Sequence, residues 1–361
     1  MATIGIACGG TGGHLYPGLA VAEKLEEAGH RIRLYVSNKE IDRTVLKHYA
    51  QFPSVALPTI GWPGLGPAAL RFCRKFYQAY RLSVGEIREH RLSAVLGMGG
   101  FTSAPLLLCA SRRRIPTLLH ESNAIPGKVT RMLATQSDRV LLGFSECSQY
   151  LNKSDCRITG TPVRSTLQRL SRADAAAHWD LHPERLTVTV IGGSQGASGL
   201  NHLIIQCLPD LAKWKDRIQM IHQTGPRDVE KVEESYRKAG IPARVFAFCE
   251  RMEMIYSMSD IMVARSGAAS LTEISCYGLP SILVPYPHAA EDHQVFNARI
   301  FEKAGAAYMI RETAPGQEEF KACLDRWILD PELRAAAAGK SPALGKIDAA
   351  ERVAREVQDV L

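Results

Sequence analysis

The sequence predicts an α/β protein of two domains, each built on a parallel sheet, and three observations support this. The chain has 361 residues, and domains average roughly 150 residues, so two well-cored domains are expected. Short apolar runs alternate with segments of helical periodicity along almost the whole chain, which is typical of strand–helix–strand units in a parallel sheet. Both halves also begin in the same way, with an apolar strand, a glycine-rich turn and a helix.

The apolar runs place seven strands in the first half and six in the second. The first-half strands are predicted at residues 3–8, 31–36, 54–57, 94–97, 117–120, 139–142 and 157–159. The second-half strands are predicted at residues 187–191, 218–222, 244–248, 261–264, 281–284 and 307–310. A helix is expected over residues 15–27, because its apolar residues recur at helical spacing.

Turn chemistry divides the chain near Pro162. The residues from Gly160 to Val163 favour a turn, and a new periodic helix is expected over residues 165–177. The predicted domains are residues 1–162 and 163–343. Residues 344–361 then form a closing amphipathic helix, with Ala350, Val353 and Val357 on its apolar side.

Charge is unevenly distributed between these halves. The net charge is +7 overall, but residues up to Pro162 include 20 basic and 11 acidic residues, a surplus of +9, and the remainder carries −2. One domain is therefore expected to meet something anionic, such as a nucleic acid, a membrane surface or a phosphorylated substrate.

Cysteine usage and hydropathy exclude several classes of protein. The nine cysteines include no C-x-x-C pair, which argues against a zinc site or a disulfide framework and favours a reducing compartment. No stretch approaches the roughly 18 apolar residues that cross a bilayer. The sequence predicts a protein that is neither exported nor membrane-spanning.

The first glycine-rich turn runs from Gly9 to His14 and follows the first strand. Glycines here let backbone N–H groups and a helix N-terminus face a ligand oxygen. The dinucleotide fingerprint fails, because Leu15 stands where its last glycine belongs and Ser37-Asn38 replaces the acidic residue of the next strand end. Glycines placed for packing alone remain an alternative.

Two further turns lie in the second half. Gly192 to Ala197 lacks the G-K-[ST] sequence of a P-loop, and Arg265 to Ser270 opens the helix that contains Glu273. Two helix N-termini in one domain can hold a diphosphate without a metal. Ordinary N-capping by Ser266 and Ser270 is the alternative.

Together the motifs identify a family. GGTGGHLYPGLAVAEKL, LGMGGFTSAP, HESNAIPGKVTRML, GTPVR, GGSQGA, HQTG, ARSGAASLTEI, GLPSILVPYP and HQVFNA occur in this order. This series resembles the undecaprenyldiphospho-muramoylpentapeptide β-N-acetylglucosaminyltransferases of glycosyltransferase family 28. The resemblance implies the GT-B architecture of two Rossmann-like domains facing a cleft, with the C-terminal helix packed on the first domain. It also implies inverting transfer of GlcNAc from UDP-GlcNAc to the C4 hydroxyl of the muramoyl sugar of lipid I, giving lipid II.

The resemblance carries donor-binding roles onto individual residues. Glu273 would hold the ribose hydroxyls, although a solvated helix residue is the alternative. Arg164 would lie near the diphosphate, which suits the planar fork of arginine. Gln294 would read the GlcNAc hydroxyls, whereas His293 replaces a family glutamine. The complete predicted UDP-GlcNAc set is Thr11, Gly12, Gly13, Asn123, Arg164, Ser194, Cys249, Gly267, Ala268, Ala269, Ser270, Leu271, Thr272, Glu273 and Gln294.

For catalysis, the resemblance points to His14 as the general base. A histidine with an ordinary pKa near 6.5 suits proton transfer at neutral pH, and phosphate contact is its alternative role. Glu121 is the second candidate for the base, while His120 and His222 are expected to be structural. Helix N-termini and Arg164 would stabilise the leaving UDP, so no metal or cofactor is required, although a divalent cation could stimulate the reaction.

A basic and aromatic segment predicts a membrane face. Between residues 50 and 85 every formal charge is positive, and aromatic residues recur at helical spacing. Such a helix can rest on an anionic bilayer, although a core helix with a solvated basic side is the alternative. The predicted membrane residues are Trp62, Leu65, Arg71, Phe72, Arg74, Lys75 and Phe76.

The expected partners are UDP-GlcNAc, lipid I and the cytoplasmic face of the bacterial plasma membrane, on which the protein would be peripheral. No nucleic-acid partner is expected, since the basic stretch has no nucleic-acid motif. A transferase that uses another lipid acceptor, such as diacylglycerol, is one alternative function. A non-catalytic protein that binds a nucleotide sugar is the other.

Overall fold

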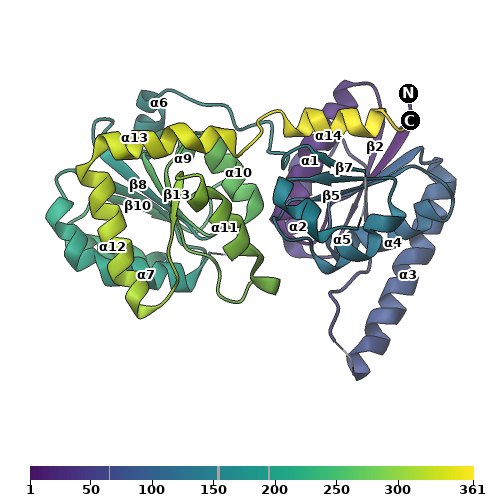
Figure 1. Ribbon diagram of the computed structural model, residues 1–361, viewed down its shortest axis with the longest axis horizontal. Helices are drawn as coiled ribbons and strands as arrows, with labels where there is room; N and C mark the ends of the chain where they lie inside the picture. The colour runs from purple at the N-terminus through teal and green to yellow at the C-terminus, as the bar shows by residue number, and fades with distance from the viewer. Residues whose placement is uncertain (65, 153–154, 194–195) are drawn as a thin grey trace. The chain divides into compact units, whose positions relative to one another are not determined.

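The computed structural model describes residues 1–64, 66–152, 155–193 and 196–361. The chain forms two compact units, and each is described by itself (Figure 1). The first unit contains Met1–Arg164 together with Lys346–Leu361, and the second contains Ser165–Gly345. The division falls two residues beyond Pro162, and the C-terminal segment belongs with the first unit.

A seven-stranded parallel sheet forms the centre of the first unit, in the order β3-β2-β1-β4-β5-β6-β7. Its strands are β1 (Thr3–Ala7), β2 (Arg31–Val36), β3 (Ser54–Ala56), β4 (Ala94–Gly97), β5 (Thr117–Glu121), β6 (Arg139–Leu142) and β7 (Cys156–Ile158). Its helices are α1 (Gly12–Glu27), α2 (Glu40–Leu46), α3 (Pro67–His90), α4 (Gly100–Ser111), α5 (Lys128–Leu133) and α14 (Ala349–Gln358), with 3₁₀ turns η1 (Lys47–Tyr49), η2 (Ala134–Gln136) and η3 (Ser145–Tyr150).

Helices cover both faces of this sheet, as a parallel sheet requires. On one face Leu19 of α1 and Val353 of α14 share a buried apolar cluster with Leu96 of β4. On the other face Leu107 of α4 packs with Val95 of β4. Val95 is adjacent to Leu96 in the strand, and adjacent side chains point to opposite faces of a sheet. Figure 1 shows α14 beside α1, and the apolar side of this C-terminal helix joins the core of the first unit.

A six-stranded parallel sheet forms the second unit, in the order β10-β9-β8-β11-β12-β13. Its strands are β8 (Leu186–Ile191), β9 (Ile218–Gln223), β10 (Ala243–Phe246), β11 (Ile261–Ala264), β12 (Ser281–Leu283) and β13 (Ala307–Met309). Its helices are α6 (Arg172–Trp179), α7 (Ser198–Leu211), α8 (Val229–Ala239), α9 (Met252–Met258), α10 (Ala268–Cys276), α11 (His293–Lys303), α12 (Ala314–Leu329) and α13 (Pro331–Lys340), with 3₁₀ turns η4 (Ala212–Trp214), η5 (Ala290–Asp292) and η6 (Ser341–Ala343).

Each of the thirteen predicted strands is present, with ends within two residues of the prediction. Apolar runs identify these strands well because a parallel sheet buries both faces. In β8, for example, Val188 and Val190 lie in the apolar core while Thr189 on the opposite face bonds Ser259 through their hydroxyl oxygens, 2.6 Å apart.

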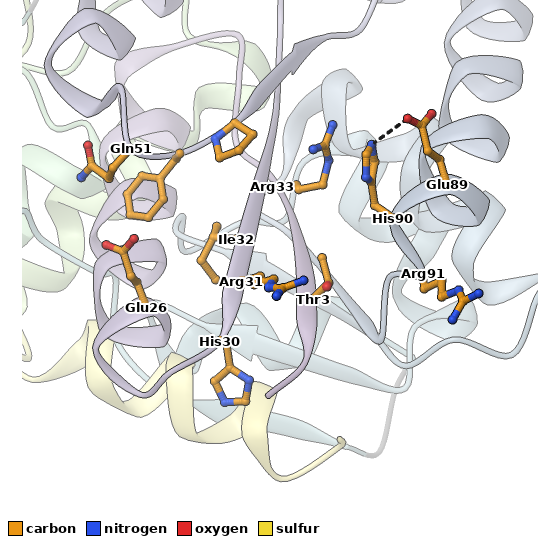
Figure 2. Close-up of a pocket in the computed structure, with 12 residues that line it drawn as sticks. Thr3, Glu26, His30, Arg31, Ile32, Arg33, Gln51, Glu89, His90 and Arg91 are labelled. Atoms are coloured by element: carbon orange, nitrogen blue, oxygen red, sulfur yellow. Dashed lines mark ion pairs between the residues drawn. The ribbon is translucent and has the colours of Figure 1, made fainter.

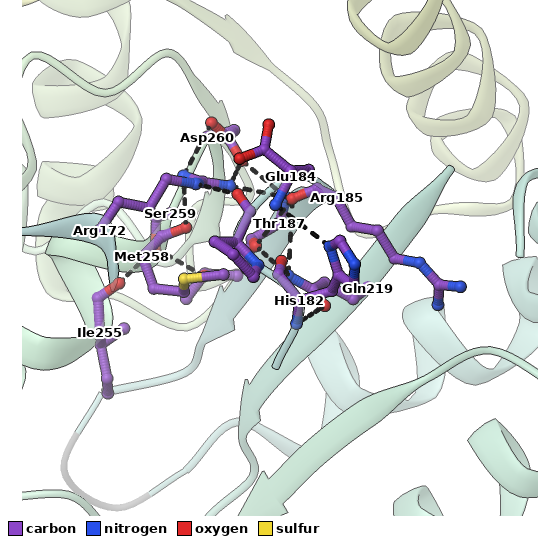
Figure 3. A network of polar contacts seen from close by, with 12 residues as sticks. Arg172, His182, Glu184, Arg185, Thr187, Gln219, Ile255, Met258, Ser259 and Asp260 are labelled. Atoms are coloured by element: carbon purple, nitrogen blue, oxygen red, sulfur yellow. Dashed lines mark hydrogen bonds and ion pairs between the residues drawn. The ribbon is translucent and has the colours of Figure 1, made fainter. Parts of the chain in front are cut away.

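The helix predicted over residues 165–177 begins later, at Arg172. Ser171 caps it by accepting a hydrogen bond from the backbone N–H of Asp174. Figure 3 shows the first residue of the helix, Arg172, whose guanidinium donates to both carboxylate oxygens of Asp260, at 3.2 and 2.7 Å. The same guanidinium also donates to the Pro183 carbonyl at 2.6 Å. Apolar periodicity alone could not locate the start of this helix, because the contact that Arg172 makes there is with Asp260, a residue far away in the sequence.

Candidate functional site

Both sheets reverse their strand order once, and the predicted residues Thr11–His14 and Gly267–Glu273 follow strands at these positions. The order reverses between β1 and β4 in the first unit and between β8 and β11 in the second. In open parallel sheets, ligands bind outside the carboxyl ends of the strands at such a switch point. The turns that follow β1, β4, β8 and β11 therefore form the candidate site of each unit.

His14 lies in the first turn of α1, against a bare stretch of backbone after β4. Its Nδ1 is 3.3 Å from Thr11 Oγ1. A Cβ atom added to Gly99 would lie 3.4 Å from His14 Nε2, and one added to Gly100 would lie 3.1 Å from its Cε1. Both glycines have positive φ, +88° and +70°, which side chains rarely tolerate. The glycines of LGMGGF thus leave space for the half-exposed imidazole.

Glu121 has a structural role that sequence reasoning missed. Its Oε1 accepts hydrogen bonds from the backbone N–H and the side-chain amide of Asn123, both at 3.0 Å. Its Oε2 accepts from the Gly127 N–H at 2.9 Å and from Thr130 Oγ1 at 2.6 Å. Four donors therefore occupy this buried carboxylate, which shapes the loop after β5. This finding argues against Glu121 as the second candidate for the base, because protonation would break bonds that hold the loop.

His120 is buried beside this loop at the end of β5. Its Nε2 lies 2.9 Å from the Gly160 carbonyl oxygen. Burial lowers the pKa of His120, which the Gly160 hydrogen bond opposes. A neutral, enclosed imidazole of this kind is structural, as the sequence predicted.

Around the start of α1, Arg164 lies over an aromatic ring. The guanidinium carbon is 4.2 Å from the centroid of Tyr16, a distance typical of a cation–π contact. Thr11 and Gly13 are exposed in the same turn, and Gly12 is half-buried. The first unit thus brings Thr11, Gly12, Gly13, His14 and Arg164 together at one helix N-terminus.

In the second unit, Glu273 is buried in α10 with 5% of its surface exposed. Tyr256 Oη donates to Glu273 Oε2 at 2.9 Å. The solvated-helix alternative for Glu273 is therefore wrong. A buried carboxylate is costly unless it is hydrogen-bonded, so Glu273 is a fixed acceptor.

The predicted segment from Gly267 to Thr272 divides into surface and core residues. Gly267, Ala269 and Ser270 are half-exposed, whereas Ala268, Leu271 and Thr272 are buried. The Leu271 N–H already donates to the Gly267 carbonyl at 3.0 Å. The N–H groups that a helix leaves unpaired in its first turn are thus those of residues 268–270, and Leu271 and Thr272 support them from inside.

The beginning of α11 is tied to the turn after β11. Ser266 Oγ donates to the Gln294 carbonyl at 2.8 Å, and the Asn297 amide donates to the Ser266 carbonyl at 3.1 Å. Gln294 Oε1 accepts from the Tyr286 N–H at 2.9 Å. His293 Nδ1 lies 2.8 Å from the Ala290 carbonyl oxygen. Gln294 is thereby held half-exposed beside the α10 N-terminus.

Cys249 and Ser194 are the other predicted donor contacts in the second half of the chain. Cys249 is half-exposed in the loop that follows β10. Ser194 lies outside the described residues.

The helix predicted to meet a membrane is α3, but its two phenylalanines point inward. Phe72 packs on Phe101 of α4 with ring centroids 5.8 Å apart, and Phe76 packs against the apolar core. The large apolar side chains of α3 that are exposed are Leu70, Tyr77 and Leu82, at 77%, 61% and 38%. Phe72 and Phe76 are thus half-buried on the packed face of α3, and their contact with a membrane stays a prediction.

The other predicted membrane residues differ in exposure. Trp62 is 41% exposed and meets Phe72 edge to face, with centroids 5.0 Å apart. Arg71 and Arg74 are exposed, and Lys75 is half-buried. Leu65 lies outside the described residues. No helix in the described part of the chain is long and apolar enough to cross a membrane.

Cavities occur at the opposite, amino-terminal edges of both sheets. The cavity in the first unit has a volume of about 550 Å³. Figure 2 shows Arg31, His90 and Arg91 among the side chains that line it. Within the described residues, Glu86, Glu89 and His90 have the spacing of metal ligands. The Glu86 carboxylate is, however, paired with Arg33 at 2.9 Å. None of the predicted site residues lines this cavity or a second one of about 490 Å³ near Arg334.

Comparison with known proteins agrees with this assignment of the two halves. The glycosyltransferase family 28 N-terminal domain matches residues 4–142, and the C-terminal domain of that family matches residues 187–353. The fold is also similar to that of a kitacinnamycin glycotransferase, with a TM-score of 0.73 at 15% identity and 99% of each chain covered. The chain belongs to glycosyltransferase family 28, and its fold is GT-B-like.

Proteins similar to this chain over nearly its full length indicate a particular group within family 28. UDP-N-acetylglucosamine--N-acetylmuramyl-(pentapeptide) pyrophosphoryl-undecaprenol N-acetylglucosamine transferases from Anaeromyxobacter dehalogenans and Geobacter metallireducens are 37% and 34% identical to it. These matches cover 97% and 98% of this chain and 90% and 97% of the relatives. The crystal structure of Acinetobacter baumannii MurG matches with a TM-score of 0.79 at 26% identity over 99% of both chains. Within family 28 the chain therefore belongs to the MurG group.

Proposed function

We propose that this protein transfers GlcNAc from UDP-GlcNAc to lipid I and so forms lipid II for peptidoglycan synthesis. The observation that carries this function is the match to transferases of that name over the full length of the chain. The placement of His14 after β1 and of the Glu273 helix after β11, at the switch points of the two units, supports it. The substrates are UDP-GlcNAc and undecaprenyl-diphosphate-linked muramoyl pentapeptide.

In the reaction, the C4 hydroxyl of the muramoyl sugar attacks the anomeric carbon of GlcNAc. The new C–O bond forms as the bond to the UDP oxygen breaks, and the configuration inverts. His14 takes the hydroxyl proton. The closeness of Nδ1 to Thr11 and the lack of side chains on Gly99 and Gly100 support this role, since together they hold the ring in one place while leaving it accessible.

The leaving diphosphate requires charge stabilisation rather than a proton. The first-turn N–H groups of α10 and the Arg164 guanidinium supply it, so the transfer needs no resident metal. Glu273 accepts the ribose hydroxyls, Gln294 reads the sugar hydroxyls, and the backbone near Cys249 reads the uracil. The buried, hydrogen-bonded state of Glu273 supports its role as a fixed acceptor.

The acceptor lipid implies that the protein acts as a peripheral protein on the cytoplasmic face of the plasma membrane. The exposed side of α3 supports this location, because Leu70 and Tyr77 lie there with the exposed cations Arg74 and Arg81. Apolar side chains beside arginines suit an anionic bilayer surface. The first unit also carries 24 basic and 15 acidic residues, a net charge of +9.

Incubation with radiolabelled UDP-GlcNAc and a lipid I analogue tests the proposal directly. Label is expected in the analogue, and diacylglycerol in a parallel reaction should remain unlabelled. Transfer to diacylglycerol but not to the analogue would assign the protein to another lipid acceptor. Binding of UDP-GlcNAc without turnover of either acceptor would make it a non-catalytic binding protein.

A further inference from the structure

A buried carboxylate beneath the glycine-rich turn of the first unit has no role in the function proposed so far. Asp42 of α2 is fully buried, at 0% exposure. Its Oδ2 accepts hydrogen bonds from the Gly10 N–H at 2.9 Å, the Ser37 N–H at 2.8 Å and Ser37 Oγ at 2.6 Å. Burying a charge costs several kcal/mol unless bonds compensate for it. Three donors on one oxygen fix this carboxylate against the turn.

A lysine binds the carbonyl of Gly10, the glycine whose N–H is bound by Asp42. Lys39 Nζ donates to the Gly10 carbonyl at 2.6 Å. Gly10 has φ +111°, a conformation that few residues other than glycine adopt. Both peptide groups of Gly10 are therefore bound by charged side chains, and the backbone conformation of this residue is fixed from two directions. We call Asp42 and Lys39 the turn clamp.

Thr11 links Gly10 to His14 through hydrogen bonds. The Thr11 carbonyl accepts from the backbone N–H of His14 at 3.1 Å and of Leu15 at 3.0 Å. Thr11 Oγ1 also lies 3.3 Å from His14 Nδ1. A rotation of the peptide between Gly10 and Thr11 would thus move both the backbone and the ring contact of His14.

We propose that Asp42, assisted by Lys39, is a positioning residue for the transfer step, which acts by fixing the turn that carries His14. The inference rests on the proposed function, since it takes His14 as the proton acceptor. Asp42 contacts neither substrate nor the reacting atoms in this account. Its effect should therefore appear in kcat and should depend on His14.

The test measures kcat and KM for both substrates in Asp42→Asn, His14→Ala and the double variant. Asp42→Asn should lower kcat by about 100-fold, because small displacements of a catalytic group cost on this scale. The KM for UDP-GlcNAc should change less than about twofold. In the His14→Ala background the same substitution should lower kcat by less than about twofold, since residues that act through one another are not additive.

Asp138 offers a control for loss of a carboxylate that bonds a strand end, at an exposed position in contrast to the buried Asp42. Its Oδ2 accepts from the Thr117 N–H at 2.7 Å and from Thr117 Oγ1 at 3.0 Å, a similar pattern at the opposite edge of the same sheet. Asp138→Asn should lower the melting temperature and leave kcat unchanged. Equal losses of kcat in Asp42→Asn and Asp138→Asn, or a full additive loss in the His14→Ala background, would overturn the proposal.

Lys39→Met keeps the proposal testable if Asp42→Asn does not fold. Lys39 is exposed, so its loss should leave the fold intact and lower kcat by about fivefold, since solvent around the ammonium reduces the contribution of its hydrogen bond to about 1 kcal/mol. An unchanged kcat in this variant would contradict the clamp. Turnover of the lipid I analogue by the unaltered protein separates these outcomes from failure of the proposed function.

Discussion

The glycine-rich turns of the two units occupy equivalent places but are held by different chemistry. In the first unit the charged side chains of Asp42 and Lys39 bind the two peptide groups of Gly10. In the second unit the Gln223 amide lies 3.4 Å from the Gly193 carbonyl, and the Asn201 amide donates to the Thr224 carbonyl at 2.9 Å. Among the described residues, a neutral amide thus meets the second turn at Gly193, while the Asp228 carboxylate accepts from the Asn201 amide at 2.8 Å beside the start of α7.

This difference follows from what each unit is proposed to do. A unit that positions a proton acceptor needs a rigid turn, and charge-assisted hydrogen bonds are about twice as strong as neutral ones. A unit that binds a diphosphate needs unpaired N–H groups at a helix N-terminus, which neighbouring carboxylates would compete for. The net charges of +9 and −2 for the two units agree with this division.

The largest expected effect is on catalysis, and it tests whether the first unit supplies the proton acceptor. His14→Ala should lower kcat by about 1,000-fold, within the usual range for loss of a general base. Donor affinity, measured by calorimetry with UDP-GlcNAc, should change little, because the proposed donor contacts of the second unit are intact. A kcat within tenfold of the unaltered protein would mean that His14 only orients a substrate.

A smaller effect is expected from substitution of Glu273, which tests whether the second unit binds the donor UDP-GlcNAc. Glu273→Ala should raise the KM for UDP-GlcNAc by about 10- to 100-fold, since hydrogen bonds to a charged group contribute about 1.5–3 kcal/mol. The KM for the lipid I analogue should stay nearly constant. Tyr256→Phe is the control, because it removes the donor at 2.9 Å while keeping the carboxylate. An unchanged donor KM in Glu273→Ala would exclude this residue from the site.

Buried histidines predict how stability depends on pH in each unit. Burial lowers the pKa of His222 to about 3, while the unfolded chain binds this proton below about pH 6.5. Between these values the unfolded state holds more protons, so stability falls as pH falls, by up to about 1.4 kcal/mol per pH unit. Burial lowers the pKa of His120 in the first unit as well, so both histidines act in the same direction.

Urea unfolding at pH 7 and pH 5 measures this effect. His222→Gln should reduce the difference between the two unfolding free energies. In the native protein His222 Nδ1 lies 3.0 Å from Tyr236 Oη, and Nε2 lies 3.1 Å from Asn201 Oδ1. Tyr236→Phe provides a control that weakens this network without removing the titrating group. The same pH dependence in His222→Gln as in the native protein would show that other groups cause it.

The smallest expected effect is on membrane binding by the exposed side of α3 in the first unit. Arg74→Gln should weaken binding to vesicles with anionic lipid by about fivefold, because one cation near the headgroups contributes about 1 kcal/mol. Arg237→Gln changes an exposed cation of the second unit, 79% accessible, and should have no effect. Leu70→Ser with Tyr77→Ser should also reduce sedimentation with these vesicles. Equal losses for Arg74→Gln and Arg237→Gln would show that net charge alone drives binding.

Much of the site could be predicted because its residues are local in sequence. The turn from Gly9 to His14 and the helix bearing Glu273 are each continuous segments, so spacing and residue type identify them. The partners of these residues could not be found in this way. Asp42 reaches the turn from a helix 32 positions later, whereas the dinucleotide pattern expects an acidic residue directly at the strand end, where Ser37-Asn38 stands.

Periodicity also identified a helix without identifying its outward face. Phe72, Phe76 and Tyr80 recur at helical spacing, as do Leu70, Cys73 and Tyr77. Both sets are apolar enough to pack, and only the position of α4 decides between them. Phe101 of that helix meets Phe72, which leaves Leu70 and Tyr77 exposed.

The sequence by itself determined the two parallel sheets, their glycine-rich turns and the family, because buried strands and bare turns require particular residues in a continuous order. The tertiary structure decided the roles of individual charges. Glu121 became a support for a loop and Asp42 a clamp on a turn, since a carboxylate in the core takes its role from the donors that surround it. Those donors come from distant segments, and only folding brings them within hydrogen-bond distance.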